Sequence, residues 1–266
     1  MPIPDSLRAE LGISSFEAVA GGCIHDCYRV NIRGKAFFLK TNDATFSDPF
    51  AAEADGLDAL RRVGVTAPEP LRHGEGYLLL EFLELNGKRD FAALGHMLAS
   101  AHRKGGPRFG WQRDNYIGST PQPNGWCDDW AEFWLERRMR PQIELASKNG
   151  FRLSLPSLKV LEKHKPQPSL LHGDLWSGNA GFTAYGPVVF DPAVYYGDRE
   201  ADLAMTELFG GFPREFYAAY EAAFPVEPGY EKRKQLYNLY HLLNHLNLFG
   251  GGYLEQVEST LRLLRL

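Results

Sequence analysis

The pattern of apolar and polar positions divides the chain into two unlike parts. Between residues 16 and 83, short apolar runs such as 36–40 and 77–83 are separated by turn residues, which is typical of strands. One helix interrupts them, because apolar residues recur at helical spacing over 49–63 and Gly64 follows. We therefore expect a small β-rich lobe that contains one helix.

Helical periodicity replaces this pattern in the rest of the chain. Five stretches place apolar residues on one helical face: residues 91–101, 130–134, 216–224, 236–246 and 253–264. Two short apolar segments, 169–171 and 188–190, are expected to be strands. The sequence thus predicts an α+β fold of two lobes that form one unit. A β-rich N-lobe, 1–83, is joined by a hinge near 81–85 to a larger, mainly helical C-lobe, 84–266.

Composition narrows the classes of protein that fit. The 266 residues are 44% apolar and 23% charged, as in ordinary globular chains with a sizeable core. A net charge of −4 gives no basic surplus for nucleic acid. Asparagine and histidine interrupt the longest uncharged stretch near the C-terminus, 235–254, so a membrane span is not expected. With three cysteines and no signal-peptide pattern at the start, we expect a cytoplasmic protein.

The stretch 170–191 carries the strongest chemical signal. Asp174 follows one apolar segment, Asn179 comes five positions later, and Asp191 follows the next segment after twelve more. Kinases use such a D-x4-N loop and a second Asp to accept the hydroxyl proton and to hold Mg²⁺. Oxygen ligands suit this hard cation. An isolated pattern of this kind more often serves a turn, so upstream residues must support it.

Upstream residues occur in the order that a kinase requires. Lys40 closes an apolar strand, and Glu53 follows thirteen residues later inside the predicted helix. Each alone is typical of a solvated charge, but together with the Asp174 loop they indicate a pair that orients Lys40 onto phosphate oxygens. Before them, Gly21 and Gly22 would let the backbone approach phosphate closely.

Longer segments carry a resemblance to a known family. These are FGWQRDNYIGSTPQPN at 109–124, HGDLWSGN at 172–179, YYGDREADLAMTELFGGFP at 195–213 and NLYHLLNHLNLFGGGY at 238–253. The chain resembles the fructosamine kinases (ketosamine-3-kinases), within the aminoglycoside-phosphotransferase-like, protein-kinase-like group, over nearly its whole length. The resemblance implies a two-lobed protein-kinase-like fold. It also implies ATP-dependent phosphorylation, with Mg²⁺, of the carbon-3 hydroxyl of ribulosamines or fructosamines on amino acids or proteins, a deglycation activity.

The resemblance also implies roles for individual residues. Asp174 would accept the proton of the sugar hydroxyl, while Asn179 and Asp191 would hold Mg²⁺. The ATP contacts would come from Lys40 with Glu53, from the loop at Gly21 and Gly22, and from the hinge backbone at Glu81, Phe82 and Leu83.

Residues close in sequence to the proposed centre are candidate substrate contacts. Trp176, Tyr195, Asp198 and Arg199 are expected to stack on the sugar or to pair with the amine, unless the charged ones form a structural ion-pair cluster. For Asp202 we favour the structural role.

Other polar residues have weaker assignments. Asn115 and Tyr116 are candidates to face the acceptor. His172 is expected to support its loop through hydrogen bonds. His241 and His245, four apart on an apolar helix, are expected to be core histidines with partners.

Cys23, His25 and Cys27 alternate along the chain. Ordinary loop thiols are favoured there over a metal site, because a fourth ligand is missing, and a redox-sensitive Cys23 is the other alternative.

Two other functions stay open at this point. One is a small-molecule kinase of the same fold that acts on choline, an aminoglycoside or homoserine, and the other is a non-catalytic nucleotide-binding module. The expected partners are ATP and a ketosamine, with no nucleic acid or membrane, for a monomer or weak homodimer.

Overall fold

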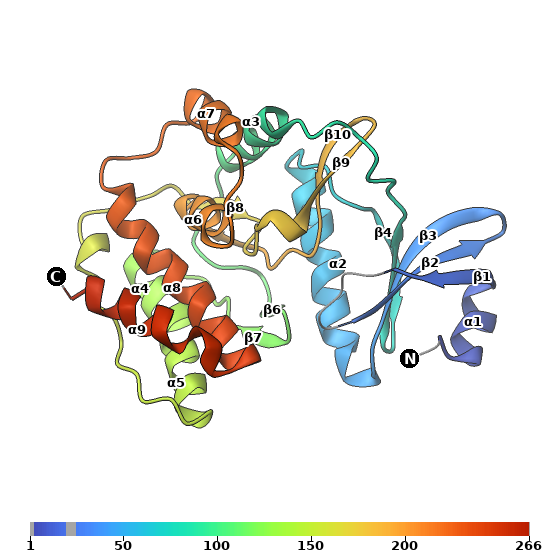
Figure 1. Ribbon diagram of the computed structural model, residues 1–266, viewed down its shortest axis with the longest axis horizontal. Helices are drawn as coiled ribbons and strands as arrows, with labels where there is room; N and C mark the ends of the chain where they lie inside the picture. The colour runs from blue at the N-terminus through green and yellow to red at the C-terminus, as the bar shows by residue number, and fades with distance from the viewer. Residues whose placement is uncertain (1–2, 20–24, 266) are drawn as a thin grey trace.

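The computed structural model describes residues 3–19 and 25–265. A β-rich part and a helical part lie side by side, with the N-terminal sheet at the right of Figure 1 and most helices at the left. The sheet is antiparallel, with five strands in the order β1-β2-β3-β5-β4. Its strands are β1 (Ile13–Ala18), β2 (Asp26–Ile32), β3 (Lys35–Thr41), β4 (Pro70–Gly74) and β5 (Tyr77–Glu81), and the short helix α1 (Asp5–Leu11) precedes them.

Alternation along the central strands gives the sheet two buried faces. Leu39 and Leu79 belong to one apolar cluster, which α1 covers, whereas Leu78 and Leu80 pack with Phe50 of the helix α2 (Ser47–Arg62). Successive side chains of a strand point to opposite faces, so Lys40, which pairs with Leu78, lies on the face toward α2. The helix ends as predicted, because Gly64 adopts a left-handed φ of 84° just beyond it.

The helical part contains every helix that the periodicity predicts. These helices are α3 (Phe91–His102), α4 (Trp130–Trp134), α7 (Arg214–Ala223), α8 (Tyr230–Phe249) and α9 (Leu254–Leu263). The helix α4 continues through a π-helical turn, η2 (Leu135–Met139), into α5 (Arg140–Lys148). The helices α1, α5 and α6 (Glu200–Leu208) were not predicted. α6 escapes the apolar pattern because Glu200 and Asp202 on its first turn are buried.

Three two-stranded sheets shape the region between the two parts. They pair β6 (Asn115–Ile117) with β7 (Thr120–Gln122), β8 (Ser169–Leu171) with β11 (Tyr195–Gly197), and β9 (Ala180–Thr183) with β10 (Gly186–Val189). The strand predicted at 169–171 is confirmed, and the segment 188–190 overlaps β10. Short 3₁₀ turns complete the chain: η1 (Ala44–Phe46), η3 (Lys159–Leu161), η4 (Ser177–Asn179) and η5 (Gly251–Tyr253).

The predicted α+β plan is therefore confirmed, with a β-rich N-terminal part and a mainly helical remainder. The division between lobes at residue 83 stays a prediction. A search of the described residues finds no helix with the length and apolar character needed to cross a membrane. Figure 1 shows α2 between the sheet and the rest of the chain, so this helix can contact both parts.

Candidate active site

Lys40 joins residues that are far apart in the sequence. Its Nζ lies 2.6 Å from Glu53 Oε1 on α2 and 2.5 Å from Asp191 Oδ1, beyond β10. Burial by itself lowers the pKa of this ammonium, but the charges of Asp191 and Glu53 outweigh burial and raise the pKa above its ordinary value. The same contact lowers the pKa of Asp191 against the opposing effect of burial. The predicted Lys40–Glu53 pair is thus formed, although burial raises the pKa of Glu53 against the opposing charge of Lys40.

The loop that carries Asp174 is held from below by a buried carboxylate. Asp202 accepts hydrogen bonds from the backbone N–H of His172 (2.7 Å) and of Gly173 (2.8 Å), and His102 Nε2 lies 3.2 Å from it. Gly173 has a φ of 81°, and a Cβ there would lie 2.1 Å from the carbonyl oxygen of Ala193. The structural role that we favoured for Asp202 is confirmed, since its carboxylate fixes the turn before Asp174.

Asp174 itself has few protein partners. Asn179 Nδ2 donates to its carbonyl oxygen at 2.9 Å and lies 3.5 Å from Oδ2. Burial, together with the negative charges of Asp191 and Asp202, raises the pKa of Asp174 to about 7. Such a carboxyl is poised to exchange a proton near neutral pH.

Two histidines flank this carboxylate and differ in their bonding. The ring of His172 bonds through Nε2 to the carbonyl oxygen of Phe190 at 3.0 Å, so it supports the loop as expected. His241 on α8 is buried, and its Nδ1 lies 3.9 Å from Asp174 Oδ1 without a hydrogen-bond partner in the described part of the chain. Burial, followed by the neighbouring His245, lowers the pKa of His241 to about 3.

His245 has a partner as predicted, whereas His241 lies in the core as predicted but its Nδ1 lacks the predicted partner among the described residues. The ring of His245 bonds to the carbonyl oxygen of residue 241 at 2.8 Å. The signal for the exception lay in α8 itself, which carries Asn238, His241 and Asn244 on an otherwise apolar helix.

The residues near Asp174 fit a hard cation. The amide nitrogen of Asn179 donates to the carbonyl oxygen of Asp174, and Oδ1 of Asp191 accepts from Lys40. Within the described residues no hydrogen bond reaches Asn179 Oδ1 or Asp191 Oδ2. Asp191 has a φ of 59°, unusual for a residue other than glycine, and its side chain is 49% exposed. Both side chains offer oxygen of the kind that Mg²⁺ prefers, and their segments adjoin, because the N–H of Phe190 donates to the carbonyl oxygen of Asn179 at 3.1 Å.

Two further elements were predicted to bind the nucleotide, the glycine loop and the hinge, and the structure describes only the hinge. Gly21, Gly22 and Cys23 lie outside the described residues. The predicted hinge begins with Glu81, the last residue of β5, whose N–H donates to the carbonyl oxygen of Glu69 at 2.9 Å, and continues with Phe82 and Leu83. Among the described residues, no hydrogen bond is made to the main chain of 82–83.

His25 and Cys27 do not behave as metal ligands. The His25 ring lies against Phe46 and Phe50, and Nδ1 is 3.1 Å from Asn42 Nδ2. Burial and then the charge of Lys40 lower the pKa of His25 to about 4. Burial raises the pKa of Cys27 to about 11, so its thiol stays protonated at neutral pH.

Trp176 is the one candidate substrate contact that reaches the surface next to Asp174. Its side chain is 38% exposed, and its ring covers Gly178 on the η4 turn. An exposed indole two residues from Asp174 can stack on a sugar ring.

The other three substrate candidates are corrected. Tyr195 is buried, with the Arg138 guanidinium 3.9 Å above its ring. Arg199 is buried and donates to the carbonyl oxygen of Phe224 at 2.9 Å. The physical reason is that β11 runs antiparallel to β8, so each residue after Tyr195 lies further from the Asp174 loop.

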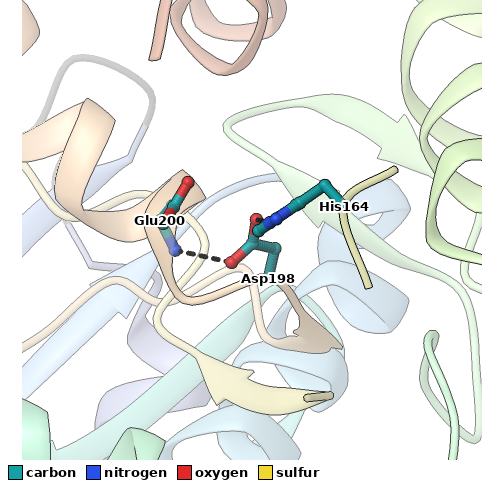
Figure 2. Close-up of side chains that lie close together, drawn as sticks. All are labelled: His164, Asp198 and Glu200. Atoms are coloured by element: carbon teal, nitrogen blue, oxygen red, sulfur yellow. Dashed lines mark hydrogen bonds and ion pairs between the residues drawn. The ribbon is translucent and has the colours of Figure 1, made fainter. Parts of the chain in front are cut away.

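Asp198 belongs to a second polar cluster in the interior. Its Oδ2 lies 2.7 Å from His164 Nε2 and accepts from Tyr237 Oη at 2.5 Å, and its Oδ1 accepts from Glu200 N–H at 3.1 Å. Figure 2 shows His164, Asp198 and Glu200 close together. Their ligand-type atoms lie within 4.8 Å of one another. Glu200 is also paired twice with Arg233, at 2.6 and 2.8 Å, so the group forms a closed ion-pair network.

Asn115 and Tyr116 do not face the acceptor side either. Asn115 is buried and donates to the carbonyl oxygen of Val194 at 2.7 Å. Tyr116 donates to Asp48 of α2 at 2.9 Å. These contacts attach β6 to its neighbours in the fold.

The fold and this set of residues define a class of protein. An aminoglycoside phosphotransferase solved with ADP and hygromycin B superposes with a TM-score of 0.65 at 13% identity, covering all of this chain (100%) and 97% of that one. The expected protein-kinase-like fold is thereby confirmed.

Comparisons of sequence assign the chain to one family within this fold. The profile of the fructosamine kinase family matches residues 3–265. A Synechocystis sp. protein assigned as a ketoamine kinase is 47% identical, covering 94% of this chain and 90% of its own. The chloroplastic protein-ribulosamine 3-kinase of Arabidopsis thaliana is 40% identical, covering 95% and 84%. A Haemophilus somnus crystal structure assigned as a fructosamine-3-kinase matches with a TM-score of 0.89 at 30% identity, covering 97% of this chain and 95% of that one. The chain belongs to the fructosamine kinase family, as its motifs indicated.

Proposed function

We propose that this protein transfers the γ-phosphoryl group of ATP to the carbon-3 hydroxyl of a ketosamine. The observation that carries the proposal is the convergence of Lys40, Glu53 and Asp191 with Asp174 and Asn179 between the two parts of the fold. Relatives named for ketoamine and ribulosamine phosphorylation support the same substrate class.

The chain's own residues perform two tasks in this proposal. Asp174 accepts the proton of the attacking hydroxyl, for which a pKa of about 7 is well matched. Lys40, held by Glu53, binds phosphate oxygens and offsets their charge. The main chain of 82–83 reads the adenine edge.

Asn179 and Asp191 would hold the Mg²⁺ through the two oxygens that have no described hydrogen bond. When bound, this ion neutralises charge on the phosphates. Asp191 would then bind Lys40 through one oxygen and the metal through the other. This shared carboxylate would fix the position of the ammonium relative to the phosphates.

Trp176 provides the exposed face on which the sugar is expected to stack. A ketosamine 3-phosphate is prone to eliminate phosphate and release the amine, which makes the reaction a step in deglycation. The acceptors are ribulosamines or fructosamines on amino acids or on proteins.

The test is ATP consumption with ribulosyl-lysine, fructosyl-lysine and a glycated protein, at several Mg²⁺ concentrations. We expect turnover that requires both a ketosamine and Mg²⁺. Choline, homoserine and an aminoglycoside serve as acceptor controls. Turnover with one of these and none with a ketosamine would contradict the proposal, and ATP binding without any turnover would favour a nucleotide-binding module.

A further inference from the structure

The segment 111–116, which the family motif FGWQRDNYIGSTPQPN contains, makes a set of polar contacts with α2. Trp111 Nε1 donates to Asp55 Oδ2 at 2.7 Å, and Gln112 Nε2 donates to Asp55 Oδ1 at 3.0 Å. Two turns earlier on the helix, Asp48 pairs with Arg113. None of these residues has a role in the proposed phosphoryl transfer, although Trp111, Gln112 and Arg113 belong to a segment that carries the family resemblance.

The geometry of α2 connects these contacts to Lys40. Asp48 and Asp55 are seven residues apart and therefore share one face of the helix. Glu53 lies two residues before Asp55, about 200° around the helix, and faces the sheet, where it meets Lys40. The helix is thus held on one side by segment 111–116 and presents Glu53 on the other.

Segment 111–116 is itself anchored close to Asp191. Asn115 donates to the carbonyl oxygen of Val194, and Gln122 of β7 donates to that of Ala193 at 3.1 Å. On the same side of α2, a Cβ at Gly56 would lie 3.3 Å from Val194 and 3.4 Å from Pro192. One rigid element therefore touches both the helix that carries Glu53 and the residues that follow Asp191.

We propose that Asp55 and Trp111 are positioning residues, which fix α2 so that Glu53 and Asp191 reach Lys40 together. The inference rests on the proposed function, in which Lys40 binds ATP phosphates. Kinases that are switched on and off control the corresponding Lys–Glu pair by moving this helix. Here hydrogen bonds from the helical part keep the helix engaged without such a switch.

Trp111 and Asp55 are suited to this task by burial and charge. Trp111 is buried, with its ring 5.6 Å from that of Tyr196, so its N–H has a fixed direction. A hydrogen bond to a charged carboxylate is roughly twice as strong as one between neutral groups. The Asp48–Arg113 pair is more exposed and contributes less.

The test uses Trp111→Phe, Asp55→Ala and the double variant in the full chain. Trp111→Phe keeps an aromatic ring but removes the N–H. We expect Trp111→Phe to lower kcat/KM for ATP by about tenfold, the size expected for one lost charge-assisted hydrogen bond. Asp55→Ala also removes the bond from Gln112 and should lower it by at least as much. KM for the ketosamine should change much less. The double variant should lose no more than Asp55→Ala alone, because that change already removes the contact with Trp111.

Asp58→Ala is the matched control, because Asp58 is an exposed carboxylate on the same helix, and no hydrogen bond or ion pair joins it to segment 111–116 within the described residues. It should leave kcat/KM for ATP unchanged. Asp55→Asn keeps an oxygen acceptor for Trp111 and should restore part of the loss. Unfolding in urea is measured for each variant, so that values refer to folded protein.

Three outcomes separate the possibilities. A loss in kcat/KM for ATP that is non-additive and absent in Asp58→Ala supports the inference. Equal kinetics for Asp55→Ala and Asp58→Ala, or losses that only follow the folded fraction, would overturn it. A wild-type protein that consumes no ATP with any ketosamine contradicts the proposed function instead.

Discussion

Two clusters of buried acids and bases lie in this molecule, and they differ in how completely their polar atoms are paired. In the cluster around Asp198, carboxylate oxygens and ring nitrogens meet partners within the protein. In the cluster around Asp174, His241 Nδ1 has no partner among the described residues, and the side chain of Asp191 is half exposed. The residue types are the same, so composition of a cluster does not reveal its role. Incomplete pairing at an accessible carboxylate marks the site, because buried polar groups without partners cost stability that only a bound ligand offsets.

The largest difference between the clusters should appear in stability. Arg233→Met leaves the buried Glu200 without its ion-pair partner, so the free energy of unfolding should fall by about 3–5 kcal/mol. Urea unfolding measures this, and kcat of the folded fraction should be unchanged. Lys234→Met is the control on the same helix, because its ion pairs reach the surface, and it should cost less than about 1 kcal/mol.

Adding Glu200→Gln to Arg233→Met should recover part of this loss. If Arg233→Met unfolds at the same urea concentration as the wild type, the closed network does not stabilise the fold.

The cluster around Asp174 should respond in the opposite way. Asp174→Asn should lower kcat at least about 100-fold, the low end for a positioned proton acceptor. Its unfolding free energy should not fall, because burial already disfavours the charged carboxylate. Kinetics at saturating ATP, with ATP binding by calorimetry, check this. Near-normal turnover with intact ATP binding would remove Asp174 from its assigned role.

The two clusters should respond to pH in opposite directions: activity is lost at low pH through Asp174, and stability is lost at high pH through His164. Asp174 must be ionised to accept a proton, so kcat/KM should fall tenfold per pH unit below an apparent pKa of about 7. The pKa of His164 is raised, since the pairing with Asp198 outweighs burial. Its stabilisation is therefore complete below its unfolded pKa of about 6.5 and is lost as pH rises through the folded value.

The measurement is unfolding and kcat/KM across pH 5 to 9 in wild type and His164→Gln. The stability difference between the two should shrink as pH rises, while the acid limb of kcat/KM stays in place. A limb that moves in His164→Gln would show that the two clusters are coupled.

The smallest effect is expected at His241. His241→Phe removes a buried nitrogen that lacks a partner, so the free energy of unfolding should stay equal or rise. If Nδ1 bonds the acceptor beside Asp174, KM for the ketosamine should rise by up to about tenfold, with little change in KM for ATP. An unchanged KM for the ketosamine would assign His241 to the core alone.

The linear order of motifs was sufficient for part of the site. Lys40, Glu53, Asp174, Asn179 and Asp191 became candidates because they occur in the order and at the spacing that phosphoryl transfer requires. The periodicities of 2 and 3.6 are local properties of the chain, so the strands and the amphipathic helices were also predictable.

Proximity in the sequence was a wrong guide to substrate contacts for Tyr195, Asp198 and Arg199. All three follow Asp191 closely. The pairing of β11 with β8 carries Asp198 and Arg199 away from Asp174, whereas Tyr195 stays near the loop but is buried against Arg138. His241, in contrast, reaches Asp174 from a helix 67 positions along the chain.

The sequence by itself determined the α+β class, the order of the elements and the residue types of the chemistry. Only the tertiary structure decided which of those polar residues meet a partner, since pairing depends on segments far apart in the chain. Lys40 meets Asp191 across 151 positions, and Trp111 meets Asp55 across 56. Such contacts arise when packed surfaces come together, and no local pattern encodes which side chains will then face each other.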